Sequence, residues 1–257
     1  MRYSEMPSMS SKFLIMADSQ VGYAVVKWLL ENYKHDIGLV VTIEQNDIWE
    51  YAKKRGVNVT VYQSDLNLIK EIENFGLCLE LGFLVWWPKI IKDGLIRLPK
   101  AGFINTHPSL LPYCRGRHYN FWSIVEQVPF GVTLHFVNAG IDTGDVVAQE
   151  PIFYGWEDNG ESLYNKAVNK MISLFQKAYP HIRVFKFNKN PQKLSEGSFH
   201  FSHEMDNVSR IDLNQKYTAK DLLNLLRART FKGHPSCWFE DDGEIYEVRV
   251  TIVRKSP

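Results

Sequence analysis

The sequence predicts an α/β protein with a mostly parallel sheet, followed by a small α+β C-terminal subdomain that contains a β-hairpin. The short apolar run at residues 13–17 is typical of a buried strand, and the runs at 38–42, 57–62 and 77–81 are predicted to form three further strands. Helical patterns separate these runs, and such β-α-β alternation favours a parallel sheet with helices on both faces. The length of 257 residues suits one large domain with a small appendage.

The other elements follow from periodicity and from residues that end helices. Residues 18–22 lead into a helix with Val25, Val26, Leu29 and Leu30 on one face. The remaining predicted elements of the large domain are helices at 47–54, 65–73 and 119–127, strands at 131–136 and 146–152, and a helix from 159–162 to about 178. Pro180 is expected to stop this last helix, because proline lacks the backbone N–H that a helix needs.

The C-terminal part has its own signals. Residues 188–207 are polar and irregular, as in a linker or a substrate loop. Thr218-Ala219-Lys220-Asp221 resembles a capping box before a leucine-rich helix, and Asp242-Gly243 predicts a hairpin turn. We therefore expect a domain at 1–187 and a subdomain at 188–257, with residues 1–10 as a loose leader. Whether Met9 is the natural start stays open.

Composition narrows the class of protein. The chain is 45 % hydrophobic and 23 % charged, with 30 basic against 29 acidic residues and a net charge of +1. This balance argues against a nucleic-acid partner. Neither an apolar signal core nor a run of 18 apolar residues is present, so we expect a cytoplasmic protein without a membrane segment.

The three cysteines are isolated in sequence. Cys78, Cys114 and Cys237 form no C-x-x-C pair, which argues against a disulfide framework or a zinc site. Cys114 has no obvious base beside it, so a nucleophilic role is not expected. A dinucleotide site is also disfavoured, because the turn at 18–22 lacks the G-x-G-x-x-G pattern.

Three polar residues carry the strongest functional signal. Asn105 and His107 are two positions apart, so on a strand both side chains leave the same face before Pro108 ends it. Asp142 lies in a turn-like Asp-Thr-Gly further on, where a plain β-turn is the alternative; Asp145 is expected to be only a turn residue.

These residue types suit transfer of an acyl group to an amine. An amide can donate to an oxygen that becomes negative, and an imidazole can move protons near neutral pH. A carboxylate can orient the imidazole or take the amine's proton through water. Which group is the base stays open.

Several separate blocks extend this signal in one order. The blocks are Phe103 to Pro112, Arg115-Gly116, Gly131-Val132-Thr133-Leu134-His135 and Ile141-Asp142-Thr143-Gly144. They resemble the formyltransferases that use N10-formyltetrahydrofolate, over roughly residues 11–185 and most densely over 80–152. The resemblance implies a Rossmann-like formyltransferase domain, catalytic roles for Asn105, His107 and Asp142, and no metal or flavin.

The resemblance also implies a pterin slot. Its lining would be Leu84, Val85 and Trp86 on one side and Asn138, Ala139 and Gly140 on the other. Residues 82–88 are expected to follow the fourth strand at the carboxyl edge of the sheet. The alternative is that Trp86 and Trp87 are core aromatics.

The acceptor-binding residues are a separate prediction. Arg115, Arg117 and Asn120 follow the first block, and two guanidinium groups near a helix start suit a phosphate or diphosphate, although a solvated loop is the alternative. The tail resembles that of formyltransferases acting on nucleotide-linked amino sugars, which implies substrate contacts for Arg229, Lys232 and Trp238. Basic residues in a last helical turn also have a purely structural explanation.

The functional hypothesis is a sugar N-formyltransferase acting on a dTDP-linked amino-dideoxy sugar for bacterial surface polysaccharide, with 4-amino-4,6-dideoxyglucose preferred. The alternatives are another amine acceptor (a dTDP-3-amino sugar, a UDP-amino sugar or methionyl-tRNA) or a non-catalytic folate- or nucleotide-binding module. A homodimer is expected by resemblance.

Overall fold

The computed structural model describes residues 12–255, which divide into two units. The first unit holds the residues up to Thr106 together with Ala178–Lys186, and the second holds His107–Lys177 and the chain from Phe187. The predicted leader at 1–10 lies outside the described residues. The predicted domain boundary at 187/188 stays a prediction.

Five parallel strands form the sheet of the first unit, in the order β3-β2-β1-β4-β5. They are β1 (Lys12–Ala17), β2 (Ile37–Thr42), β3 (Val59–Val61), β4 (Leu79–Val85) and β5 (Phe103–His107). Strands β1, β2 and β4 are buried over nearly their whole length. Continuous apolar runs of this kind occur in parallel strands that are covered on both faces.

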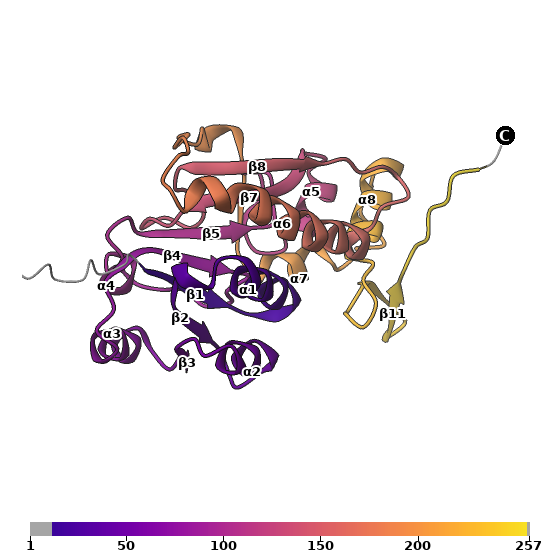
Figure 1. Ribbon diagram of the computed structural model, residues 1–257. Helices are drawn as coiled ribbons and strands as arrows, with labels where there is room; N and C mark the ends of the chain where they lie inside the picture. The colour runs from indigo at the N-terminus through magenta and orange to yellow at the C-terminus, as the bar shows by residue number, and fades with distance from the viewer. Residues whose placement is uncertain (1–11, 256–257) are drawn as a thin grey trace, which may run out of the picture. The chain divides into compact units, whose positions relative to one another are not determined.

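Helices alternate with these strands as predicted. They are α1 (Ser19–Asn32), the short 3₁₀ helix η1 (Lys34–Asp36), α2 (Asp47–Lys54), α3 (Asp65–Asn74) and α4 (Asp93–Ile96). Asn46 and Ser64 begin α2 and α3, since their side chains accept hydrogen bonds from backbone N–H groups of the first turn. Helices α1 and α2 pack side by side (Figure 1).

Strand β4 is longer than predicted. It runs to Val85, whereas the sequence pattern placed residues 82–88 after the strand. A Cβ on Gly82 would lie 2.3 Å from a ring atom of Phe103 on β5, so glycine lets that ring pack against the strand. The buried strand therefore continues through a residue that usually weakens strands.

The long helix α6 (Gly160–Ile182) also exceeds its predicted end, because it continues past Pro180. Proline removes one backbone hydrogen bond from the helix. Tyr179 and Ile182 are nevertheless 0 % and 1 % exposed, and their burial in the last turn outweighs that loss.

The end of α6 is tied to Asp36 of η1 within the first unit. The Tyr179 hydroxyl donates to Asp36 at 2.9 Å, and Arg183 donates to both carboxylate oxygens at 2.7 and 2.8 Å. Burial alone would raise the pKa of Asp36, but the hydrogen bonds from Arg183 and Tyr179 hold it below its usual value.

Asp36→Ala is expected to lower the free energy of unfolding by about 1.5–3 kcal/mol, because it leaves a buried hydroxyl and a guanidinium without their acceptor. Since the folded pKa of Asp36 is depressed, this stabilisation is complete above the unfolded value of about 3.9 and is lost as the pH falls further. Urea unfolding at pH 7 and pH 3 measures both effects.

The control is Asp93→Ala, which breaks only the exposed pair with Arg97 and should cost under about 1 kcal/mol. An equal loss in the two variants at pH 7 would contradict the assignment.

The second unit contains an antiparallel pair of strands, β7 (Phe130–Phe136) and β8 (Val146–Ile152). Around them lie β6 (Arg115–Gly116), α5 (Tyr119–Val125), η2 (Leu194–Glu196), β9 (Phe199–His200), α7 (Glu204–Val208) and α8 (Ala219–Arg229). Helices α5 and α8 pack against each other. Helix α5 ends two residues earlier than predicted, where Gln127 takes a left-handed conformation with φ 56°.

The predicted helix start and hairpin turn are confirmed, whereas residues 188–207, which were expected to be irregular, contain η2, β9 and most of α7. The Thr218 side chain accepts from the N–H of Asp221 and donates to its carboxylate, which starts α8. Strands β10 (Cys237–Asp241) and β11 (Glu244–Val248) form the predicted hairpin, shown near the C-terminal end in Figure 1. Asp242 and Gly243 both have positive φ, as a type I′ hairpin turn requires.

Candidate active site

The carboxylate of Asp142 lies between two histidine rings in the second unit. His107 Nδ1 is 3.4 Å from Asp142 Oδ2, and His135 Nε2 is 3.5 Å from Oδ1. The backbone N–H of Gly116 donates to Oδ2 at 3.0 Å. All three side chains are largely buried, with exposed fractions of 6 %, 2 % and 13 % for His107, His135 and Asp142.

Burial and neighbouring charges change the pKa values of Asp142 and His107. Burial by itself would raise the pKa of Asp142, but attraction to His107, contact with His135 and the Gly116 N–H hold it far below its usual range. Burial lowers the pKa of His107, against the opposing effect of Asp142. At neutral pH the site therefore contains a carboxylate beside an imidazole that gives up its proton readily.

Both ring nitrogens of His107 face oxygen atoms. Nδ1 faces Asp142, and Nε2 is 3.5 Å from the carbonyl oxygen of Cys114. These distances are longer than full hydrogen bonds. Acceptors beside both ring nitrogens can stabilise the imidazole in its charged form. Such a ring can hold, for a short time, a proton that a reacting group releases.

His135 is a site residue that the sequence reasoning did not select. It stood in a block used only for the resemblance, Gly131 to His135. Its Nδ1 lies 2.9 Å from the carbonyl oxygen of Phe136, and its Nε2 faces Asp142 Oδ1. The available signal was alternation along β7, which turns Thr133 and His135 to one face of the strand.

Asn105 lies on β5, two residues before His107, so both side chains leave the same face of that strand. In the first unit Asn105 pairs in register with Leu84 of β4. Leu84 and Val85 are buried, and Trp86 takes a left-handed conformation with its N–H bonded to Thr106 Oγ1 at 2.9 Å. The structure therefore brings the first half of the predicted pterin lining beside Asn105, at the carboxyl edge of the parallel strands.

The second half of that lining is part of the Asp142 loop. Asn138 Oδ1 accepts from the Gly140 N–H at 3.1 Å and from the Thr143 hydroxyl at 2.7 Å, and residues 138–140 are exposed. A Cβ on Gly144 would lie 1.9 Å from the carbonyl oxygen of Phe136, so the loop closes tightly against β7. Asn138 thus shapes the loop that carries Asp142.

The predicted acceptor-binding residues differ in how far they are already engaged. Asn120 donates to the Gly160 carbonyl, and Arg115 Nε donates to the Ser198 carbonyl. Arg229 is 8 % exposed and pairs with Asp206 at 2.6 Å. These three contacts have structural roles.

Arg117 and Lys232 are exposed, and the Trp238 ring lies half-buried under Arg210. Burial lowers the pKa of His118, and the hydrogen bond to the Ser202 carbonyl and the charge of Asp206 oppose this effect while the charges of Arg229 and Arg117 add to it, so α5 begins in an environment of mixed charge. This environment lies within the second unit.

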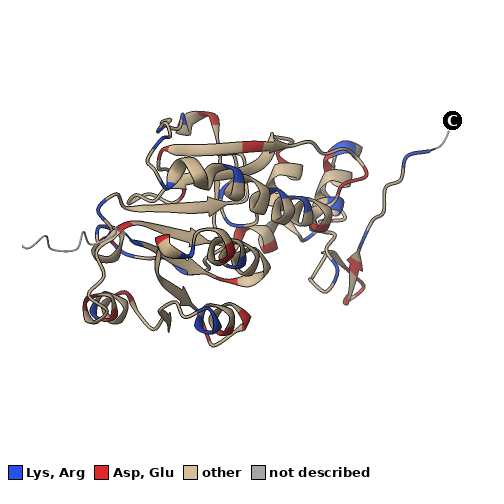
Figure 2. Cartoon of the chain, viewed as in Figure 1, with Lys and Arg blue, Asp and Glu red and all other residues tan. Residues whose placement is uncertain are grey.

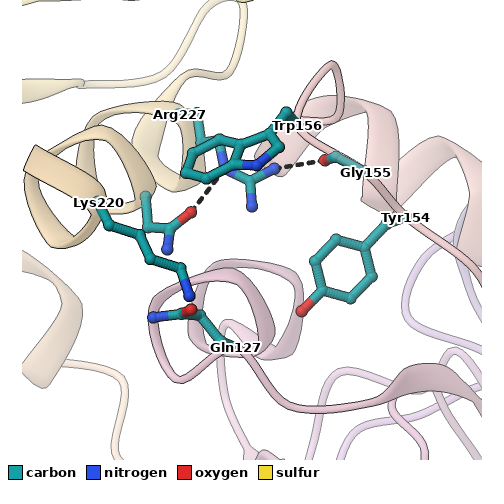
Figure 3. A pocket seen from close by; sticks show the side chains of 7 residues that line it. Gln127, Tyr154, Gly155, Trp156, Lys220 and Arg227 are labelled. Carbon is teal, nitrogen blue, oxygen red and sulfur yellow. Dashed lines mark hydrogen bonds between the residues drawn. The ribbon is translucent and has the colours of Figure 1, made fainter.

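A separate cavity of about 300 Å³ lies in the second unit near the other end of the β7–β8 pair. Figure 3 shows its walls, which are Gln127, Tyr154, Gly155, Trp156, Lys220, Asn224 and Arg227. None of the predicted site residues lines it. Two cationic side chains, Lys220 and Arg227, line the cavity. Arg227 donates to the Gly155 carbonyl and to Asn224, so it has a structural role.

Residues 12–255 show neither a membrane-spanning helix nor a cluster of metal ligands. No helix in this range is long and apolar enough to cross a bilayer. The same residues contain no group of three or more histidine, cysteine, aspartate or glutamate side chains placed to hold a metal ion.

Comparison with known families gives two matches. The Formyl transferase family profile matches residues 8–178, and the profile of the N-formyltransferase dimerization C-terminal domain matches residues 204–254. Among curated proteins, dTDP-4-amino-4,6-dideoxyglucose formyltransferase of Mycobacterium tuberculosis is 29 % identical over 189 residues, covering 72 % of this chain and 77 % of that protein.

Two further relatives bear on the acceptor. Methionyl-tRNA formyltransferase of Alkaliphilus oremlandii is 30 % identical over 175 residues, covering 66 % of this chain and 55 % of that protein. The N-formyltransferase of Helicobacter canadensis, solved with folinic acid and dTDP-3-aminofucose, is 20 % identical with a TM-score of 0.70 over 91 % of this chain and 85 % of that one. The predicted α/β fold with its C-terminal hairpin is confirmed.

Proposed function

Since the chain belongs to the formyl transferase family, we propose that it transfers the formyl group of N10-formyltetrahydrofolate to the amine of a dTDP-linked amino-dideoxy sugar. The preferred acceptor is dTDP-4-amino-4,6-dideoxyglucose, and the product would enter bacterial surface polysaccharide. The main structural support for catalysis is the position of the Asp142 carboxylate, which lies between His107 and His135 and accepts from the Gly116 N–H.

The proposed chemistry uses this chain's residues as follows. The neutral amine attacks the formyl carbon, and Asn105 donates to the oxygen as it becomes negative. His107 stabilises that oxygen or takes the proton that the amine nitrogen releases. Asp142 orients His107 and balances its transient charge. The bond between the formyl carbon and the donor nitrogen would then break, and that nitrogen would take up the proton that the amine released, which gives tetrahydrofolate.

The pterin slot rests on family membership together with the burial pattern. Leu84, Val85 and Trp86 lie at the carboxyl edge of the strands, where open α/β sheets bind ligands. Asn138, Ala139 and Gly140 are proposed to supply backbone contacts from the Asp142 loop. The Helicobacter canadensis protein was solved with a formylated folate, which supports a folate donor in this family.

Sequence identity alone does not select the acceptor, because the sugar-specific relative at 29 % and the tRNA-specific relative at 30 % are nearly equal. Two other observations favour the sugar. The C-terminal match over residues 204–254 is to an N-formyltransferase dimerization domain. The net charge is only +1, and basic and acidic segments are interspersed in each unit (Figure 2), unlike the basic surface expected of a tRNA-binding protein.

We also propose a cytoplasmic homodimer. The family of the C-terminal domain supports dimerization, and the β10–β11 hairpin exposes Ile245 and Tyr246 at 67 % and 48 %. Exposed apolar side chains on a hairpin suit a self-association surface.

Lys232→Ala is expected to raise KM for the nucleotide sugar by about tenfold with little change in kcat, because its ammonium is exposed and free to pair with a diphosphate. Steady-state kinetics with a fixed excess of the formyl donor measures the effect. Lys220→Ala removes another lysine from the same subdomain, one that lines the separate cavity, and should leave KM unchanged. Equal KM values for wild type and Lys232→Ala would place Lys232 outside the acceptor site.

The test of the whole proposal is mass-spectrometric turnover with N10-formyltetrahydrofolate and a panel of amines. The panel contains dTDP-linked 4-amino and 3-amino dideoxy sugars, UDP-amino sugars, glycinamide ribonucleotide and methionyl-tRNA. Formylation of a dTDP-4-amino sugar supports the proposal. Formylation of another member alone keeps the reaction and refutes the acceptor, and no product on any acceptor favours a binding module.

A further inference from the structure

The polar segment that the sequence marked only as a linker or substrate loop makes two separate sets of contacts around Asp142. We refer to residues 190–204 as the 190–204 segment. One end holds the backbone of the Asp142 loop. The other end holds the strand whose N–H group donates to the Asp142 carboxylate. Both sets lie within the second unit.

At the first end, Gln192 contacts the loop directly. Its amide nitrogen donates to the carbonyl oxygens of Asp142 at 2.9 Å and Gly144 at 2.7 Å. Two carbonyl acceptors on one side identify that atom as the NH2 group. Asn190 adds an antiparallel bridge to Val146, with both backbone bonds formed at 2.8 and 2.9 Å.

The loop needs such support because Asp142 has φ 53°, a left-handed conformation that a residue with a side chain adopts at a cost. This conformation helps to direct the carboxylate between His107 and His135. The two bonds from Gln192 stabilise the loop on both sides of Thr143. Without them, more extended conformations of Asp142 would compete and the carboxylate would move.

Packing alone would not favour an amide side chain at position 192. Its Oε1 is buried and has no hydrogen-bond partner among the described residues. An unpaired buried acceptor costs on the order of 1–3 kcal/mol, which an apolar side chain of similar size would avoid. The amide is therefore explained by its two donated bonds and not by filling space.

At the second end, β9 pairs with β6. The N–H groups of Arg115 and Arg117 donate to the carbonyl oxygens of Ser198 and His200, both at 3.1 Å. The N–H between them, that of Gly116, donates to Asp142. The pairing thus fixes the direction of the N–H that lowers the pKa of Asp142.

Strand β9 is anchored in turn by Glu126. His200 Nε2 is 2.6 Å from one oxygen of Glu126, and the Ser198 hydroxyl donates to the other at 2.6 Å. The other ring nitrogen of His200 is 2.9 Å from Glu204, and the ring stacks on Trp122 with centroids 3.8 Å apart. Because Glu126 and Glu204 hold the two ring nitrogens of His200 and Trp122 covers one face of the ring, His200 keeps β9 in place.

We propose that Gln192 and His200 are positioning residues for the Asp142 carboxylate, each acting through the backbone group that it holds. The inference rests on the proposed function, because it assigns Asp142 a role in the reaction. Neither residue needs to touch substrate, so both should affect kcat more than KM.

The test compares Gln192→Ala and the isosteric Gln192→Glu, whose ionised side chain cannot donate, with Gln149→Ala. Gln149 is a matched control, because its amide also donates two hydrogen bonds, but to the Leu111 carbonyl at 2.7 Å and to Thr133 at 2.9 Å instead of to the Asp142 loop. Both Gln192 variants should lower kcat by about 10–100-fold with KM changed less than about threefold, the size expected for misplacing a catalytic group by an ångström. Gln149→Ala should stay within about threefold of wild type.

A double-mutant cycle makes the test specific. In an Asp142→Asn background, Gln192→Ala should have little further effect on kcat, because there is no carboxylate left to position. Additive effects, or a Gln192→Ala rate equal to that of Gln149→Ala, would overturn the proposal. His200→Ala should follow the same pattern, and Glu126→Gln, which keeps a hydrogen-bond acceptor, should be milder.

A readout without turnover separates this inference from the proposed function. The ring-nitrogen NMR signals of His107 and His135 should shift in Gln192→Ala and remain in place in Gln149→Ala. Unchanged signals in both variants would refute the positioning role whatever the enzyme formylates. If the signals shift while wild type formylates no acceptor, the positioning holds and the proposed reaction is wrong.

Discussion

His107→Ala is expected to lower kcat by about 10²–10⁴-fold, the range for removing a positioned general acid or base. His107 Nδ1 lies 3.4 Å from Asp142 Oδ2, so the substitution removes the only imidazole proposed to hold the amine's proton. Single-turnover formylation of the preferred dTDP sugar measures the loss directly, free of product release. His181→Ala removes an exposed histidine near the end of α6 and should have no effect on the rate.

The pH dependence of wild-type kcat then separates the two roles open to His107. Burial lowers the pKa of His107, so the neutral ring predominates at pH 7. If the neutral ring takes the amine's proton, kcat rises as the pH rises through that pKa and reaches a plateau above the ordinary value of about 6.5. If the charged ring stabilises the oxyanion, kcat instead falls across the same range. A rate that follows neither course, together with an active His107→Ala variant, would remove His107 from the mechanism.

Asn105→Ala is expected to lower kcat by about 10²–10³-fold, as does the loss of one oxyanion-hole donor in other enzymes. The donor acts on an oxygen that becomes negative only during the reaction, so KM should change little. The measurement is kcat and KM for both substrates, with circular dichroism to check the fold.

Asn58→Ala provides the matched control in the same unit. Asn58 is a part-buried amide that donates to the Gly38 carbonyl at 3.1 Å. Its loss should lower stability and leave kcat unchanged. Comparable kcat losses in Asn105→Ala and Asn58→Ala would indicate that Asn105 contributes to folding and not to the reaction.

Local sequence patterns predicted most elements of the fold. Apolar runs identified the buried strands, and Thr218 and Asp242-Gly243 correctly marked a helix start and a hairpin turn. The errors occurred where distant packing outweighed a local signal. Strand β4 continues through Gly82 because the Phe103 ring packs there, and α6 continues past Pro180 because Tyr179 is buried.

The candidate site shows the same division. Asn105, His107 and Asp142 could be selected because their residue types and order match a chemistry and a family. His135 and the Gly116 N–H were not selected. Alternation along β7 predicts the face of the strand on which His135 lies, but no local pattern indicates that His135 or Gly116 faces Asp142. Asn120 and Arg229 were selected for a substrate and are engaged by Gly160 and Asp206, which leaves their predicted role untested.

The sequence by itself determined the α/β class, the family and the three polar residues proposed for the reaction, because each of these depends on short segments whose periodicity or residue order is local. Only the tertiary structure decided how Asp142 is held. Gly116 lies 26 positions before Asp142 and Gln192 lies 50 after it, and both bonds to that residue exist only once the chain has folded. Hydrogen bonds between such distant residues depend on backbone direction, which no local pattern of side chains specifies.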